Sequence, residues 1–122
     1  MERKVYNDPI NINKKEWLEI LDDDITYQNV LDILRFLLEK HEERTGIIAE
    51  KFGYSHLIAV NKIIAAYGDR IITKYPKVKC PKYENGKPAW FHVSLLAEKK
   101  DGFWYFKLRP ELAEALKVYK TE

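Results

Sequence analysis

The chain has 122 residues and a net charge of +2, with 46% hydrophobic and 33% charged residues. This length suits one domain that buries a modest core, and the single cysteine, Cys80, excludes an internal disulfide and fits a reducing cytoplasm. No stretch approaches the ~20 apolar residues of a membrane span, and the first residues lack the apolar core of a secretory signal. We therefore expect one cytoplasmic domain without a membrane partner.

The charge is distributed unevenly along the chain. Residues 1–50 hold 7 Lys/Arg and 12 Asp/Glu, whereas residues 51–122 hold 14 Lys/Arg and 7 Asp/Glu. An acidic half beside a basic half favours one face made for an anionic partner, most commonly the phosphate backbone of a nucleic acid. An ordinary mixed surface is the alternative.

The N-terminal segment is predicted to lie outside the regular structure. Asn7, Asp8 and Pro9 break helices and strands, so residues 1–13 are expected to form an irregular arm. A single compact domain of the DNA-binding type is predicted over residues 14–119.

Two helices are expected to begin this domain. The first covers residues 14–22 and turns Trp17, Leu18 and Leu21 inward. Thr26 is predicted to cap a longer helix that runs to about His41. Its apolar residues recur at helical spacing in a broad stripe, which indicates the central helix of the core: Val30, Leu31, Ile33, Leu34, Leu37 and Leu38.

The next segment has the pattern of a helix-turn-helix unit. Thr45 is predicted to cap a helix through Phe52, Gly53 to end it, and Ser55 to cap a second helix that ends at Gly68. Two short helices joined by a tight glycine-containing turn are typical of this motif. A plain pair of core helices is the alternative.

Residues 69–87 are predicted to form a long basic loop, because prolines and the Asn85-Gly86 pair interrupt regular structure. A long loop between packed units is often functional, and a disordered segment with solvated lysines is the alternative. The basic residues from the end of the second helix through this loop are Arg70, Lys74, Lys77, Lys79, Lys82 and Lys87.

The last third of the chain predicts a hairpin followed by a helix. Strands are expected at residues 89–97 and 103–108, with a turn at Glu98–Gly102, and Pro110 is expected to start the final helix. The expected fold is therefore α+β: mainly helical, with a helix-turn-helix-like unit and a C-terminal two-stranded antiparallel hairpin, as in winged-helix proteins.

The two faces of the predicted hairpin differ in composition, because side chains alternate across a strand. The face assigned to the core carries Phe91, Val93, Leu95, Trp104, Phe106 and Leu108. The opposite face is expected to form an exposed wing or aromatic platform of Trp90, His92, Ser94, Tyr105 and Lys107.

The sequence offers no convincing catalytic or metal site. Its three histidines are dispersed, its five glycines form no phosphate loop, and neither serine lies in a nucleophile elbow. Glu98 and Lys100 resemble the end of a metal-dependent nuclease signature but lack an upstream aspartate on an adjacent strand. Asp22–Asp24 fits a solvated helix end. We expect neither catalysis nor a cofactor.

One resemblance covers residues 14–118. An aromatic strand, a turn and a strand that ends in Leu108-Arg109-Pro110-Glu111-Leu112 resemble the small N-terminal modules of modified-cytosine-dependent (Mcr-type) restriction systems, which are fused to HNH endonucleases or McrB-type motor subunits. Ile48-Ala49 to Gly53 is similar as well, whereas Phe106 stands where such modules often carry tryptophan. The resemblance implies a non-catalytic DNA-binding module that targets a nuclease or motor subunit and senses modified cytosine.

These observations predict double-stranded DNA as the partner. His56, Asn61 and Lys62 on the second helix are expected to reach base edges, and the basic residues from Arg70 to Lys87 are expected to contact phosphates. The rival interpretation is a protein-interaction module that uses Trp90, Phe103 and Tyr105 as a partner interface.

Overall fold

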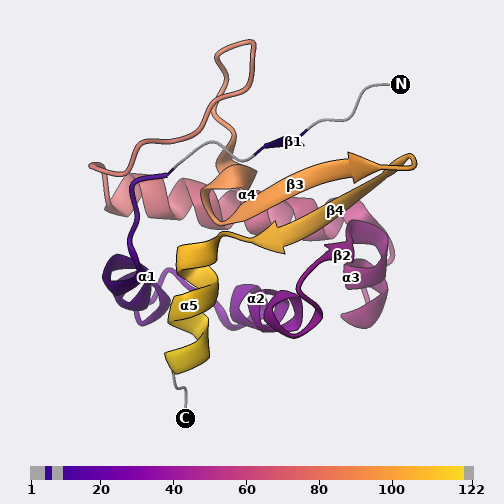
Figure 1. Ribbon diagram of the computed structural model, residues 1–122, viewed down its shortest axis with the longest axis horizontal. Helices are drawn as coiled ribbons and strands as arrows, with labels where there is room; N and C mark the ends of the chain where they lie inside the picture. Colours follow the sequence, from indigo (N-terminus) through magenta and orange to yellow (C-terminus); the bar gives the residue numbers. More distant parts are fainter. Residues whose placement is uncertain (1–4, 7–9, 120–122) are drawn as a thin grey trace.

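The computed structural model describes residues 5–6 and 10–119. In this part of the chain it contains five α-helices and a four-stranded antiparallel sheet, which confirms the predicted α+β class (Figure 1). The helices are α1 (Lys14–Leu21), α2 (Gln28–Lys40), α3 (Thr45–Lys51), α4 (Leu57–Lys74) and α5 (Pro110–Val118). A short 3₁₀-helix, η1 (Trp90–Val93), precedes the C-terminal hairpin.

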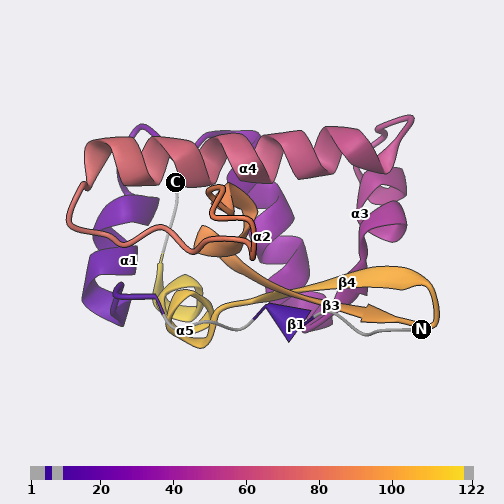
Figure 2. The ribbon, with the colours of Figure 1, turned by 90° about the horizontal axis from the view of Figure 1, so that it is seen from above.

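The sheet has the strand order β1-β3-β4-β2. Its strands are β1 (Val5–Tyr6), β2 (Glu43–Arg44), β3 (Leu95–Lys100) and β4 (Phe103–Leu108). Figure 2 shows α4 along one long side of the molecule and the β3–β4 hairpin along the opposite side, with α1 and α3 toward the two ends. Helix α2 contacts β4, α4 and α5, and its apolar stripe is buried, so it is the central core helix as predicted.

The helix caps differ from those predicted at three positions, Thr26, Thr45 and Ser55. Thr26 does not cap α2; its hydroxyl donates a hydrogen bond to the carbonyl of Ile20 and lies 2.9 Å from the Tyr67 hydroxyl. At the start of α4 the cap is His56 and not Ser55, because the His56 imidazole accepts a hydrogen bond from the Ile58 amide. Helix α2 begins after Tyr27 and α3 after Arg44, and neither has a side-chain cap hydrogen bond, so Thr45 is the first residue of α3 and not its cap.

Helix α4 does not end at Gly68 but continues to Lys74. Gly68 is buried against η1, and a Cβ atom at this position would overlap the backbone carbonyl of Trp90. The glycine therefore permits a close approach between two elements and does not end the helix. As a result the basic loop begins only at residue 75, and it projects from the α4 side in Figure 1.

The hairpin is shifted along the chain relative to the prediction. Residues 90–93 form η1 and not a strand, so β3 starts at Leu95 and extends to Lys100. The turn consists only of Asp101 and Gly102, with φ of 52° and 83°. Two consecutive residues with positive φ are typical of the type I′ turn, which matches the twist of a hairpin. The second strand is confirmed at residues 103–108.

The N-terminal arm is not irregular throughout. Val5 and Tyr6 pair with Glu98 and Ala97 of β3. The Asn11 amide donates to the carbonyl of Lys77 and accepts from the amide of Lys79, both at 2.8 Å, which ties the arm to the basic loop. The predicted breakers at positions 7–9 lie outside the described residues.

Helix α5 begins at Pro110 as predicted and buries Leu112 and Leu116. The residue before the proline has a role that the sequence did not reveal. Arg109 is buried, and its Nε and Nη2 atoms donate to the carbonyl of His92 at 2.9 and 2.7 Å. This pair of hydrogen bonds joins the start of α5 to η1.

Candidate functional site

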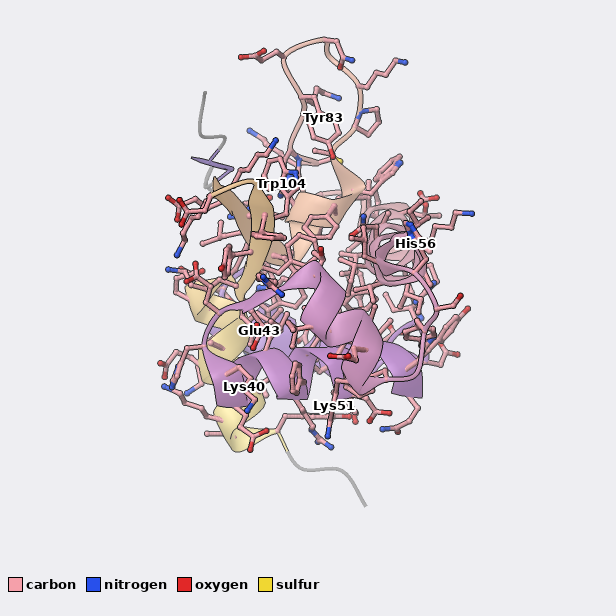
Figure 3. All side chains as sticks on the ribbon, turned by 90° about the vertical axis from the view of Figure 1, so that its right-hand side faces the viewer. Lys40, Glu43, Lys51, His56, Tyr83 and Trp104 are labelled. Carbon is pink, nitrogen blue, oxygen red and sulfur yellow. The ribbon has the colours of Figure 1, made fainter. Side chains whose placement is uncertain are left out.

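An aromatic pocket opens where the hairpin, η1, the basic loop, the first turn of α3 and the N-terminal half of α4 meet. Its volume is about 500 Å³, within the range of small-ligand sites. Six of its lining residues carry rings: Tyr83, Phe91, His92, Phe103, Trp104 and Phe106. Figure 3 faces this end of the molecule, with Tyr83 on the basic loop above and Trp104 on the hairpin.

The floor of the aromatic pocket is a packed ring cluster. Phe91 and Phe106 are buried, with their ring centroids 4.2 Å apart, and His92 lies 5.1 Å from Phe91. Tyr83 approaches His92 edge-on at 5.9 Å from the basic loop. Because η1 is fixed on one side by Gly68 and on the other by Arg109, this floor is held rigidly.

One wall of the aromatic pocket is the second turn of α4, where Asn61 lies between Leu57 and Ala65. The Asn61 side-chain oxygen is buried and has no hydrogen-bond partner among the described residues. A buried amide oxygen without a partner costs roughly 1–3 kcal/mol. An amide presents a donor and an acceptor side by side, which matches the hydrogen-bonding edge of a nucleobase.

The ionised side chain that lines the aromatic pocket is a cation, and the described lining residues include no carboxylate. This cation is Arg44, whose guanidinium carbon lies 4.4 Å from the Phe103 ring centroid. Lys62 follows Asn61 on α4, and Lys82 precedes Tyr83 on the loop; both lysines are exposed. Arg44 therefore adds a positive charge to the aromatic lining of the pocket.

The predicted nucleic-acid residues on α4 fall into two groups at opposite ends of the helix. Asn61 lines the aromatic pocket, Lys62 is exposed beside it, and His56 is exposed at the cap. Arg70 and Lys74 lie 9 and 13 residues after Asn61, which is roughly 14–20 Å along the helix. The structure therefore does not bring all five residues into one site.

Arg70 and Lys74 make contacts within the fold. The Arg70 Nε donates to the Ile25 carbonyl at 3.0 Å, and its guanidinium stacks 3.8 Å from the Tyr27 ring centroid. The Lys74 ammonium lies 2.8 Å from Asp23. These contacts connect α4 to the segment between α1 and α2.

The predicted loop lysines lie on the segment after α4. Lys77 forms an ion pair with Glu16 at 3.3 Å, and Lys79 donates its backbone amide to Asn11. Lys82 and Lys87 are exposed near the tip of the loop, beside Tyr83. Of this group, the two tip lysines lie beside a residue that lines the aromatic pocket.

The predicted outward face of the hairpin does not exist as one surface. His92 and Ser94 are buried and Trp90 is half-buried, because the 3₁₀ turn replaces strand alternation in this segment. Tyr105 and Lys107 are on the side of the hairpin opposite Trp104 and Phe106, the two pocket residues of β4.

Several pocket residues were missed by the sequence analysis or assigned to the core. Arg44 and Tyr83 were not predicted as site residues, because they lie on a short strand and on a loop whose sequences have no periodic pattern. Trp104 was assigned to the core, yet it is half-buried and lines the pocket. The signal that pointed here was the surplus of aromatic residues in the last third of the chain.

Among the described residues, no group of three or more histidine, cysteine, aspartate or glutamate side chains is arranged to hold a metal ion. None of the described helices has both the length and the apolar character to span a membrane. No family model, curated protein or solved structure matches the chain.

Proposed function

We propose that this chain is a non-catalytic DNA-binding module that takes one base out of the duplex into the aromatic pocket. The observation that carries the proposal is an aromatic-lined pocket whose lining also includes one cation, Arg44, and one amide side chain, Asn61. An extruded base requires a slot with stacking surfaces and a polar group for its edge. Stacking on aromatic side chains contributes about 1–3 kcal/mol per base.

The charge around the aromatic pocket supports a polyanionic ligand. Arg44 lies in its lining, Lys62 and Lys82 are exposed and adjacent in sequence to the lining residues Asn61 and Tyr83, and the described lining residues include no carboxylate. Phosphate contacts from such cations supply sequence-independent affinity, and the pocket would supply the selectivity.

The α3–α4 unit supports a helix-turn-helix-like mode of approach. Gly53, at φ 77°, lets the chain turn after α3, and α4 begins at the pocket mouth. The exposed side of α4 carries Lys62 but also Asp69. The N-terminal half of α4, together with the hairpin acting as a wing, is therefore the part that would face DNA.

The proposal includes the restriction context that the resemblance implies. A module of this size with a base-sized pocket suits the targeting of a separate nuclease or motor subunit, with modified cytosine as the extruded base. The hydrogen-bonding edge of cytosine offers the donor and acceptor that an amide matches.

A titration of labelled duplex tests the proposal. Duplexes with unmodified, 5-methyl or 5-hydroxymethyl cytosine are titrated at ~50 and ~200 mM salt, where phosphate contacts predict affinity that falls steeply with salt. Asn61→Ala is expected to weaken the preferred duplex about tenfold or more while it retains the salt-dependent component. Lys62→Ala should weaken all duplexes alike.

Lys117→Ala is the matched control, since this lysine is exposed on α5 and pairs with Glu114. We expect it to bind like the wild type. Absence of binding to every duplex at ~50 mM salt would contradict the proposal.

The second candidate function is protein interaction, and one observation favours it. Leu57, Ile58 and Phe103 are exposed apolar residues, and two of them, Leu57 and Phe103, line the aromatic pocket. Apolar residues within a polar surround also occur at protein interfaces. If the chain associates with a protein partner, the association is independent of salt concentration, and DNA is not bound, this second function is the correct one.

A further inference from the structure

Phe103 is a large apolar side chain at the rim of the aromatic pocket. It is 49% exposed, yet it belongs to the pocket lining and is the first residue of β4. A ring that is both exposed and part of a pocket mouth lies where a bound duplex would run.

The Phe103 ring is also held firmly. It follows the two-residue Asp101–Gly102 turn, whose positive φ angles fix the hairpin tip, and the Arg44 guanidinium packs 4.4 Å from its centroid. Its cross-strand neighbour Lys100 is bound to Glu42 at 2.7 Å. An exposed ring in a rigid tip loses little conformational freedom when it is buried by a partner.

We infer that Phe103 is a wedge that enters the base stack of the DNA. Its ring would fill the gap that remains in the stack when the extruded base moves into the aromatic pocket. This inference rests on the proposed function. Extrusion of a base leaves a gap and removes its stacking, and an inserted apolar side chain offsets that loss. The adjacent Arg44 is positioned to contact the phosphate beside the gap, since it lines the same mouth.

Tyr27 provides a matched comparison within the same chain. It is 52% exposed and stacks with an arginine, Arg70, at 3.8 Å, so its surroundings resemble those of Phe103. However, neither Tyr27 nor Arg70 belongs to the pocket lining, and Arg70 lies five residues beyond Ala65, which lines the pocket, roughly 7–8 Å along the helix. The wedge inference assigns a function to Phe103 and none to Tyr27.

The test compares Phe103→Ala, Phe103→Trp and Tyr27→Ala on two duplexes. One duplex is fully paired around the preferred cytosine of the titration above, and in the other this cytosine faces adenine. A mismatched base is easier to extrude, so it needs less help from a wedge. We expect Phe103→Ala to lose tenfold or more in affinity on the paired duplex and to recover to within about threefold of the wild type on the mismatched one.

The remaining variants make the test selective. Phe103→Trp should bind both duplexes like the wild type, since it retains an aromatic wedge, and Tyr27→Ala should do the same. Thermal unfolding of each variant verifies that it is folded, and Phe103→Gln, which keeps a side chain but removes the apolar wedge, replaces the alanine variant if that one is unfolded.

The failures of the two proposals are distinguishable. If Phe103→Ala binds the paired duplex like the wild type, or loses equal affinity on both duplexes, the inference of a wedge is wrong. The proposed DNA-binding function is then unaffected. If the wild type binds neither duplex at ~50 mM salt, both the wedge and the proposed function are wrong.

Discussion

The buried guanidinium of Arg109 links the start of α5 to the floor of the aromatic pocket. Its two hydrogen bonds to the His92 carbonyl come from atoms held in one plane, and its backbone amide donates to the carbonyl of Ser94 at 3.2 Å. A lysine has a single ammonium and cannot reproduce this fork. The residue therefore acts as a positioning group for η1.

We predict that Arg109→Lys lowers the free energy of unfolding by about 1.5–3 kcal/mol, the range for hydrogen bonds to charged groups. Urea unfolding followed by circular dichroism measures the change. Arg35→Lys is the control, since that side chain is only half-buried on α2 and should change stability by less than about 0.5 kcal/mol. If the two substitutions change the free energy of unfolding equally, Arg109 does not position η1.

At the scale of elements, the contact between α4 and η1 determines where the pocket floor lies. Gly68 faces the Trp90 carbonyl so closely that a methyl group has no space. Because the opposing atom belongs to the backbone, it cannot move away as a side chain could. A larger residue at position 68 must displace η1 or bend α4.

Gly68→Ala is therefore expected to destabilise the protein by about 1–3 kcal/mol, although alanine favours helices more than glycine does. Displacement of η1 should also weaken any ligand of the aromatic pocket. Thermal and urea unfolding report the first effect, and the duplex titration reports the second.

Gly46→Ala provides the opposite expectation, since nothing lies within 4 Å of a Cβ atom at that position of α3. This variant should be neutral or more stable by up to about 1 kcal/mol. A stable Gly68→Ala variant with unchanged binding would contradict the packing argument.

At the scale of the whole molecule, a polar cluster joins the segment between α1 and α2 to the end of α4. Asp23 is only 11% exposed, and it accepts hydrogen bonds from the Lys74 ammonium at 2.8 Å and the Tyr75 hydroxyl at 2.7 Å. These two hydrogen bonds hold the pKa of Asp23 well below its usual range. Burial, together with the bond to Asp23, raises the pKa of Tyr75 to about 12.

The lowered pKa of Asp23 gives the stability a defined pH dependence. The carboxylate stabilises the fold at every pH above its unfolded pKa of ~3.9, and this contribution is lost as the pH falls below that value. We predict that Asp23→Asn is less stable than the wild type at pH 7 and that the difference shrinks toward pH ~2.5. Urea midpoints at both pH values measure it.

Asp24→Asn is the matched control for this measurement. The Asp24 side chain is 93% exposed and lies 3.6 Å from the same ammonium. We expect little change at either pH, because exposed ion pairs are screened by solvent. A similar loss in both variants at pH 7 would assign the effect to the overall charge and not to the buried cluster.

Local patterns predicted those elements whose cause is local. The apolar spacing of α2, the stop at Gly53 and the start of α5 at Pro110 agree with the structure, because neighbouring residues determine them. The hairpin turn was placed near Gly102 for the same reason. Such features follow from helical periodicity and backbone sterics, which do not depend on distant parts of the chain.

The candidate site required the tertiary structure. Asn61 was predicted to face DNA in a groove, whereas its side chain lines a pocket that distant segments complete. The sequence could not show that residues 90–93 leave the strand, since this depends on Gly68 and Arg109 at long range. His92 and Ser94 were assigned to the surface because strand alternation was assumed for this segment. They are buried because the segment does not follow that alternation.

The sequence by itself therefore determined the α+β class, the central helix, the hairpin and the charge asymmetry of this protein, because each is a property of composition or of neighbours along the chain. Only the tertiary structure decided which aromatic residues form the core and which line the aromatic pocket. The physical reason is that a pocket is a gap between elements. Close backbone packing at Gly68 and hydrogen bonds from Arg109 position its walls, and both contacts join residues far apart in sequence.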